Sequence, residues 1–346
     1  MHQKIWRGCW NPRQTVKSAT STHGVRLKNS SIISPNSTSS SKSAHLEGRL
    51  RDLPVTSIQQ SLRDGSLTLA VEPFTVAFRS DIVGVAQALA LLYGDYRMVA
   101  PDYADFHIGV RRARDHRRWL KAQAFFDFDG QTPFFPLPLA HAYPLLEWGF
   151  NWCIGTHAHA YLIFHAAVVE RHGKAFVLPG EPGAGKSTLT AALTAAGYRL
   201  LSDELTMLAT ATGQIVPVPR PISLKNASID IVRRRIPDAV LSELAYETSK
   251  GTVAHLQPPA ASIAAAGCNA APGYIVFPRY SAGSETQFTP VGKAETLLRL
   301  LEQAFNFHVL GERGFALARD LVQASSCFEL TYSNLDEAIE RLSALS

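Results

Sequence analysis

The sequence has few cysteines, no long apolar run and no secretory signal. Cys9, Cys153, Cys268 and Cys327 are far apart and form no CxxC pair, which excludes a disulfide framework and a structural zinc site and favours a reducing, cytoplasmic setting. No stretch approaches the roughly 18 uninterrupted apolar residues of a membrane span. We therefore expect a soluble protein with no membrane partner.

Acidic residues are absent from the amino-terminal segment. Seven Lys and Arg residues and no acid precede Glu47, so the net charge of +5 leaves the rest of the chain at −2, and a nucleic-acid partner is not expected. Half of residues 18–43 are Ser or Thr, too polar to offset the entropy of ordering. We expect a disordered tail over 1–46; an organelle transit peptide or a start codon assigned too far upstream are the alternatives.

Residues 47–150 have the pattern of a small α+β region. Apolar periodicity predicts a helix over 82–93, strands over 106–112 and 117–128, and a helix over 138–154. No group of residues in this region has catalytic spacing. We therefore look for the chemistry after residue 150.

A glycine-rich segment follows two predicted strands. Apolar residues at 162–170 and 175–179 predict the strands, and a helical stretch ending at Gly197 comes after the segment. This strand–loop–helix context is the one that the phosphate-binding motif GxxxxGK[ST] requires. The segment consists of Gly180, Glu181, Pro182, Gly183, Ala184, Gly185, Lys186, Ser187 and Thr188.

The residue types of this segment suit a nucleotide triphosphate. Gly180, Gly183 and Gly185 let the backbone adopt φ values that side chains disfavour, so that N–H groups turn toward a phosphate, and the following helix adds its positive end. Lys186 can reach the β- and γ-phosphates, and the Ser187 hydroxyl can coordinate Mg²⁺. We therefore expect ATP and Mg²⁺ to bind at residues 180–188.

Two carboxylates end the next predicted strand. Asp203 and Glu204 come 17 and 18 residues after Lys186, and the carboxyl ends of strands in α/β sheets lie beside the ligand. Asp203 could hold Mg²⁺ or accept the proton of an attacking hydroxyl. An acidic pair that caps the next element is the structural alternative.

The order of these motifs resembles the catalytic domain of HPr kinase/phosphorylase, and more closely the HPr-kinase-related branch called HprK-related kinase A. The resemblance covers residues 160–210 and depends on the run His165-Ala-Ala-Val-Val-Glu, the glycine-rich segment and the run Leu200-Leu-Ser-Asp-Glu. It implies that Asp203 is the acid/base residue of phosphoryl transfer and that His165 lies near the site. Glu204 stands for the family's second Asp, beside Asp203 and Ser187 at the metal.

The resemblance also implies a fold. It predicts an α/β protein in which a P-loop nucleotide-binding domain, like the carboxyl-terminal domain of HPr kinase, occupies 151–346 after the small α+β region and the tail. Thr188 stands where that family commonly has Glu, and the Arg-Gly-rich second signature is absent. Arg220 and Lys225 are candidates for neutralising the transferred phosphoryl group, or ordinary loop cations.

These motifs predict an ATP- and Mg²⁺-dependent kinase. The acceptor would be a hydroxyl, Ser or Thr, on a protein or peptide, and the resemblance favours a homo-oligomer. A P-loop NTPase whose acceptor is water, a nucleotide-sensing module without catalysis, and a small-molecule kinase are the alternatives. The rest of the chain predicts a strand at 274–278 and helices over 294–303 and 335–345.

Overall fold

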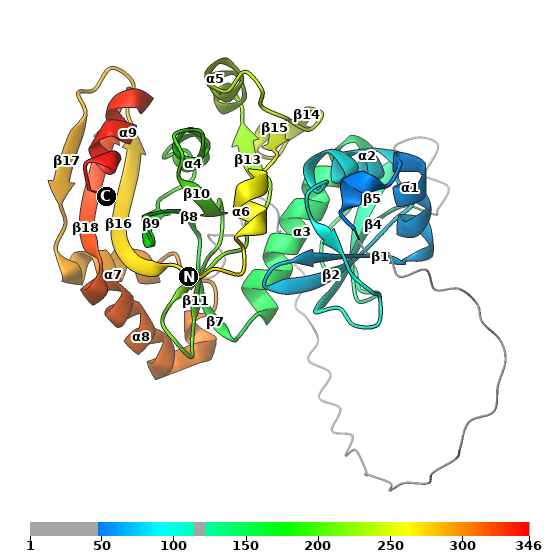
Figure 1. Ribbon diagram of the computed structural model, residues 1–346, viewed down its shortest axis with the longest axis horizontal. Helices are drawn as coiled ribbons and strands as arrows, with labels where there is room; N and C mark the ends of the chain where they lie inside the picture. Colours follow the sequence, from blue (N-terminus) through cyan, green and yellow to red (C-terminus); the bar gives the residue numbers. More distant parts are fainter. Residues whose placement is uncertain (1–47, 114–121, 346) are drawn as a thin grey trace, which may run out of the picture.

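The chain folds into a mixed α/β structure with several sheets. The computed structural model describes residues 48–113 and 122–345, so the predicted tail at 1–46 lies outside the described residues. Two six-stranded sheets, each with its own helices, are joined through a region with two three-stranded sheets (Figure 1). None of the helices described is both long and apolar enough to cross a bilayer.

The first sheet has the strand order β3-β1-β2-β4-β5-β6, and only its β2–β4 pair is parallel. Helix α3 packs on this sheet and also contributes to a core that includes strands from the second half of the chain. The elements are α1 (Val55–Asp64), β1 (Leu67–Val71), β2 (Phe74–Ser80), α2 (Val83–Leu92), β3 (Arg97–Met98), β4 (Phe106–Arg112), β5 (Gln123–Phe128), β6 (Leu137–Pro138) and α3 (Ala142–His157).

Most of the predicted elements of this region are confirmed. The helix expected over 82–93 is α2, and the strand expected over 106–112 is β4. Strand β5 covers the second part of the strand expected over 117–128, whose first residues lie outside the described residues. Helix α3 starts later than predicted because a 3₁₀ turn occupies Leu139–His141, and it continues past residue 150.

The second sheet has the order β10-β8-β9-β16-β18-β17, with β9, β16 and β18 parallel. Both of its faces are buried. Along β9, Phe176 and Leu178 face the core shared with α4, α5 and α9, and Ala175 and Val177 face the core shared with α7 and α8 (Figure 1). This period of two is the strand pattern that a covered parallel sheet requires.

The bounds of this half are as follows. The sheet and its helices are β8 (Ala166–Arg171), β9 (Lys174–Pro179), α4 (Lys186–Ala195), β10 (Arg199–Ser202), α5 (Ala227–Arg235), β16 (Ala271–Tyr280), β17 (Gln287–Pro290), α7 (Lys293–Leu301), α8 (Phe307–Ala324), β18 (Ser326–Tyr332) and α9 (Leu335–Ser343). The smaller sheets are formed by β7 (Tyr161–Phe164), β11 (Thr206–Ala209) and β12 (Ile215–Val216), and by β13 (Ile222–Lys225), β14 (Ala245–Thr248) and β15 (Gly251–Leu256), with α6 (Ala260–Ala264) beside them.

The prediction of a single strand over 162–170 is wrong. The chain breaks at His165 into β7, which pairs with β11, and β8, which pairs with β9 and β10. The reason is that the His165 N–H donates to the carbonyl oxygen of Gln303 at 2.8 Å instead of joining either ladder. Residues 162–164 and 166–169 are apolar on either side of His165, so periodicity alone did not locate the break.

Candidate functional site

The glycine-rich segment lies between β9 and α4, as predicted. Its loop residues 181–183 are exposed, and the segment becomes buried only at Thr188. Gly183 and Gly185 have φ values of 90° and 89°, which other residues adopt at a cost. Gly180 is not in that region, so the expectation that it too needs a left-handed backbone is wrong. A Cβ there would make ordinary contacts, at 3.4 Å from Ala184 Cβ.

Tyr332, the last residue of β18, packs directly against Gly185. The hydroxyl of Tyr332, on β18, donates to the carbonyl oxygen of Gly185 at 3.3 Å. A Cβ on Gly185 would lie 2.5 Å from that hydroxyl oxygen and 3.2 Å from Cβ of Tyr280. The Tyr280 N–H in turn donates to Ala184 O at 3.1 Å. Contacts with β16 and β18 therefore stabilise the conformation of the loop.

Lys186 and Ser187 begin helix α4 and face the acid pair. The Lys186 ammonium donates to the carbonyl oxygens of Gly180 and Glu181, and burial lowers its pKa, with Glu204 and Asp203 opposing that shift. The Ser187 side chain lies close enough to the Asp203 carboxyl group to lower the pKa of that group. Strand β10 therefore delivers Asp203 beside the start of α4, as the sequence predicted.

The other residues of the segment have different roles. The Thr188 hydroxyl donates to Ser228 Oγ at 2.7 Å and so points toward α5. Glu181 is exposed and accepts a bond from Gln303 at 3.5 Å. Pro182 is exposed at the loop. None of these three side chains has a contact with the acid pair, so Glu181 and Thr188 could bind a phosphate through their backbone N–H groups, which Pro182 lacks.

Asp203 is buried, with 4% of its surface exposed. Its Oδ2 accepts the Ser223 N–H at 3.1 Å, and its Oδ1 has no hydrogen-bond partner among the described residues. Burial and the neighbouring Glu204 raise its pKa to about 7, with Ser187 and Ser223 opposing that shift. A carboxyl group with such a pKa can both take up and release a proton near neutral pH.

The pKa of Glu204 is lowered, because positively charged side chains lie close to it. Lys225 Nζ lies 4.0 Å from its Oε1, and His165 Nε2 lies 4.0 Å from its Oε2. Burial alone would raise its pKa, but the positive charges of Lys225, Lys250 and Lys186 hold it at about 2. Glu204 is therefore ionised throughout the physiological range. The turn between β14 and β15 brings Lys250 here.

His165 lies at the site, as the resemblance implied, and it is neutral. Burial and the charge of Lys186 lower its pKa to about 4, although Glu204 opposes the shift. The ring is tilted against Phe305 at 5.9 Å. A neutral imidazole at 4.0 Å from a carboxylate makes a polar contact and adds no charge.

Arg220 does not reach the glycine-rich segment. Its guanidinium is buried over the ring of Phe150, 4.3 Å from the centroid, donates to Oδ1 of Asn151 and lies 3.9 Å from Oε2 of Glu147. The interpretation of Arg220 as a cation for the transferred phosphoryl group is therefore wrong, since carboxylate, amide and ring groups of α3 already bind it. Lys225 keeps its candidate role.

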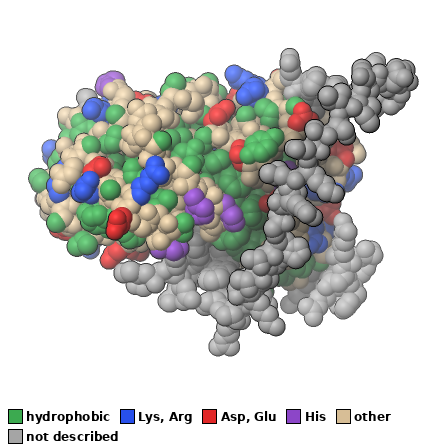
Figure 2. Space-filling model, turned by 90° about the horizontal axis from the view of Figure 1, so that it is seen from below, with side chains coloured by type: hydrophobic (Ala, Val, Ile, Leu, Met, Phe, Trp, Pro, Cys, Tyr) green, Lys and Arg blue, Asp and Glu red, His purple; other side chains and the backbone are tan. Residues whose placement is uncertain are grey.

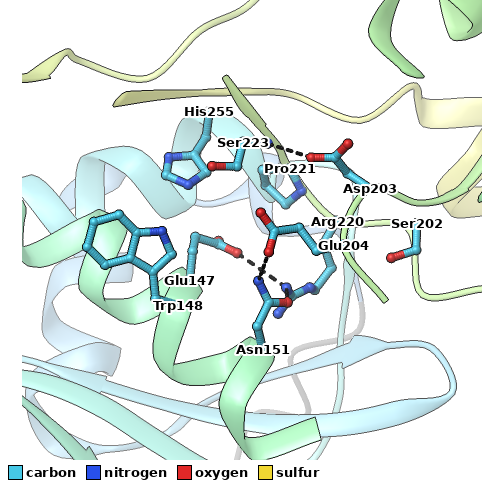
Figure 3. A pocket seen from close by; sticks show the side chains of 10 residues that line it. All are labelled: Glu147, Trp148, Asn151, Ser202, Asp203, Glu204, Arg220, Pro221, Ser223 and His255. Atoms are coloured by element: carbon cyan, nitrogen blue, oxygen red, sulfur yellow. Dashed lines mark hydrogen bonds and ion pairs between the residues drawn. The ribbon is translucent and has the colours of Figure 1, made fainter. Parts of the chain in front are cut away.

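Helix α3 supplies residues that the sequence interpretation missed. Nδ2 of Asn151 donates to Oε2 of Glu204 at 3.5 Å, and Glu147 and Trp148 lie nearby (Figure 3). The one signal for them was a Glu and an Asn four residues apart, on one face of an otherwise apolar helix. Glu147 and Trp148 belong to the region 47–150, in which no group with catalytic spacing was predicted, and α3 places them beside the acid pair.

Comparisons with known proteins do not assign a family. No protein-family model matches the chain, and a search of curated proteins gives no match. The functional argument therefore depends on the geometry of the site: a glycine-rich segment at a helix start, an acid pair with opposed pKa values, and lysines from three separate elements.

Proposed function

We propose that the protein is an ATP- and Mg²⁺-dependent kinase that transfers the γ-phosphoryl group to a Ser or Thr hydroxyl of a protein or peptide. The observation that carries the proposal is the convergence of Lys186, Lys225 and Lys250 on the acid pair beside the glycine-rich segment. Three lysines face one ionised carboxylate and one carboxyl group that is half neutral near pH 7. The excess positive charge is what a triphosphate would balance.

Each residue has a proposed role in the transfer. Backbone N–H groups of residues 180–188 would bind the phosphates, and the ammonium of Lys186 would leave the carbonyl oxygens that it now contacts for a phosphate oxygen. Lys225 and Lys250 would stabilise charge on the transferred group. Asp203 would take the proton of the attacking hydroxyl, which its pKa of about 7 suits. His165 would stay neutral near this centre.

The residues present fit Mg²⁺. This ion prefers oxygen ligands and is held in proteins by one or two side chains together with phosphates and water. Ser187 and Asp203 lie together, Glu204 is the adjacent ionised carboxylate, and Oδ1 of Asp203 has no partner in the described part of the chain. When bound, Mg²⁺ would neutralise charge on the phosphates.

The proposed partners follow from the same site and from the surface. Charged side chains are scattered singly on the face shown in Figure 2, between apolar and neutral ones, and such a distribution gives no support to nucleic-acid binding. We propose a cytoplasmic protein whose phosphoacceptor is a protein or peptide. The resemblance of residues 160–210 to HPr-kinase-related proteins supports the P-loop fold, the protein acceptor and a homo-oligomer.

Transfer of labelled γ-phosphate to proteins of a cell lysate tests the proposal. Lys186→Ala should lower transfer by about 100-fold or more, because a charge that stabilises the transition state is removed. Lys174→Ala, at the exposed start of β9, the strand that precedes the glycine-rich segment, is the control and should transfer like wild type. Equal transfer by wild type and Lys186→Ala, with circular dichroism showing both folded, would refute the proposal.

Asp203→Asn separates the kinase from its rivals. The variant should bind nucleotide like wild type and lose transfer to a protein, since it lacks the base. Label that collects as free phosphate in wild type would favour an NTPase. Nucleotide binding without any turnover in wild type would favour a sensing module.

A further inference from the structure

Tyr280 is an exposed aromatic residue beside the glycine-rich segment. It ends β16, the neighbour of β9 in the second sheet, and 49% of its surface is exposed. Single exposed aromatic residues are common on protein surfaces. Among those of the described residues, Tyr280 is the one with a backbone hydrogen bond to the segment, from its N–H to Ala184 O at 3.1 Å. The others are Tyr103, Phe135, Tyr246 and Phe315.

Neighbouring contacts fix the position of Tyr280. Its own N–H is bonded to Ala184, and the N–H of Ser281 donates to the carbonyl oxygen of Tyr332 at 2.9 Å. The rings of Tyr280 and Tyr332 meet at 71°, with their centroids 5.9 Å apart. At such an edge contact Tyr332 can cover at most one face of the Tyr280 ring. Tyr280 therefore has an ordered backbone and a ring face that Tyr332 leaves open.

The turn after β16 consists of small residues. Ser281, Ala282, Gly283 and Ser284 follow Tyr280 directly. Both the N–H and the hydroxyl of Ser284 donate to the carbonyl oxygen of Ser281, at 3.1 and 2.8 Å, so the turn is internally bonded. A planar ligand could pack on the ring without displacing a large side chain of this turn.

The strand order places Tyr280 on the side of the glycine-rich segment away from the acid pair. Strands β9 and β16 are parallel, and β9 and β10 are each antiparallel to β8. The carboxyl ends of β10, β9 and β16 therefore lie at one edge of the sheet, with β8 and β10 on one side of β9 and β16 on the other (Figure 1). With neighbouring strands about 4.8 Å apart, Tyr280 lies about one spacing from β9 and about three from β10, which leads to Asp203.

This order gives a bound triphosphate a direction. The transferred phosphate has to lie at Asp203, since that carboxylate would take the proton of the acceptor. The rest of the nucleotide then extends away from Asp203, and ligands of α/β sheets lie along the carboxyl ends of the strands. On the far side of β9 that edge leads to Tyr280. Nucleic-acid bases stack on such aromatic rings.

Other roles for Tyr280 fit less well. An acceptor peptide has to bring its hydroxyl to Asp203, on the opposite side of β9. A residue that only supports the loop would be covered, as Tyr332 is with 1% of its surface exposed. A phosphate would need a cation, and the adjacent Arg279 is directed to the other face of the strand.

We propose that Tyr280 stacks on the base of the bound nucleoside triphosphate, so that the base subsite lies over the end of β16. This inference rests on the proposed function, because it needs a triphosphate on residues 180–188. Stacking uses the flat face that every base has, so the ring contributes affinity and little discrimination between ATP and GTP. Tyr280 is then a binding residue that does not act on the transferred phosphate.

Calorimetric titration of the full chain with Mg²⁺ and either ATP or inorganic tripolyphosphate tests the subsite, since tripolyphosphate has no base. Tyr280→Ala should raise the Kd for ATP about tenfold and leave the Kd for tripolyphosphate unchanged. Tyr280→Phe keeps the ring and should bind both like wild type. Tyr103→Ala, on the connection between β3 and β4, removes another exposed tyrosine. It is the matched control and should change neither Kd.

Kinetics and fluorescence give further readouts. Tyr280→Ala should raise KM for ATP about tenfold and keep kcat, because the ring would bind the ground state and the transition state alike. Tyr280→Trp should bind ATP like wild type. ATP should quench the fluorescence that this variant adds to that of wild type, and tripolyphosphate should not.

The outcomes separate the subsite from the proposed function. Equal ATP affinity in wild type and Tyr280→Ala would overturn the subsite, and so would an equal loss of affinity for ATP and tripolyphosphate, which would mean that the loop had moved. ATP binding that falls in Lys186→Ala but not in Tyr280→Ala would remove the subsite and leave the proposed function standing. Wild type that binds neither ligand would refute both.

Discussion

The pKa values of two adjacent carboxyl groups are shifted in opposite directions. The pKa of Asp203 is about 7, and that of Glu204 is about 2. Asp203 is buried and Glu204 is partly exposed, but burial by itself would raise the pKa of both groups. Lys225, Lys250 and Lys186 lower the pKa of Glu204, whereas the charge of Glu204 adds to burial in raising the pKa of Asp203, with Ser187, the Ser223 N–H and Lys225 opposing that shift. The position of a few cations therefore divides the pair into a permanently charged member and a member that can exchange a proton near neutral pH.

A buried histidine makes stability depend on pH. Burial lowers the pKa of His255 from 6.5 to about 3, with charges of Lys225, Arg220 and Lys250 adding to the shift and Glu204 opposing it. The ring of Tyr143 packs on it at 5.1 Å. Between pH 3 and 6.5 the unfolded chain binds a proton that the folded protein does not, so this histidine's contribution to stability is lost as the pH falls.

We predict that His255→Gln flattens this dependence. The free energy of unfolding should change less with pH between about 4 and 6, by about 1.4 kcal/mol per pH unit, because one proton is no longer taken up on unfolding. Urea denaturation at several pH values measures the slope. The same substitution at the exposed His159 should leave the slope as in wild type. An unchanged slope in His255→Gln would show that the ring is already protonated in the folded protein.

At the scale of elements, local motifs were predictable and distant pairings were not. Strand β9, the glycine-rich segment and α4 follow one another in the chain, and their pattern predicted all three. The β13–β15 pair joins Ser223 to His255 across 32 residues, and α5 and β14 lie between them in the chain, so no local pattern relates the two positions. No spacing in the sequence connects α3 with Asp203. The site was therefore found from its phosphate-binding half, and its other half required the fold.

The contact of Gly185 with β18 gives a prediction for the glycine-rich segment. Gly185→Ala places a methyl group 2.5 Å from the Tyr332 hydroxyl at a φ of 89°. We expect a destabilisation of about 1–3 kcal/mol and at least a tenfold loss of ATP affinity, because the loop must shift. Denaturation and calorimetric titration measure the two effects.

Two further variants separate the clash from the backbone strain. Gly197 ends the same helix region with a φ of 92° and open space around its Cβ position. Gly197→Ala should therefore cost stability but keep ATP affinity. Adding Tyr332→Phe to Gly185→Ala removes the clashing oxygen and should recover part of the affinity. Equal ATP binding by Gly185→Ala and wild type would contradict the proposed place of the nucleotide.

At the scale of the whole molecule, a buried ionic network joins the two halves. Glu147 on α3 accepts bonds from Tyr93 and Tyr143 at 2.8 Å each and faces Arg220, which follows β12 in the second half. Burial raises the pKa of Glu147, and Arg220 opposes that shift. The contacts of Glu147 therefore connect the first half of the molecule with the segment between β12 and β13, which carries Arg220.

Breaking this network should loosen the molecule as a whole. Arg220→Met leaves Glu147 buried without its cation, so we predict a loss of about 3 kcal/mol in the free energy of unfolding. Arg319→Met removes an exposed pair with Asp320 and should change stability by less than about 0.5 kcal/mol. Chemical denaturation compares them, and equal midpoints would show that Arg220 does not hold the halves together.

The contact between Tyr332 and Gly185 also sets an order of events during synthesis. The glycine-rich segment leaves the ribosome early, but the residue that supports it from below is encoded 147 positions later. Chains emerge amino terminus first, so the glycine-rich segment is synthesised long before the strand that supports it. A nascent or prematurely released chain that lacks β18 would carry the whole motif without the contact that holds Gly185 in place.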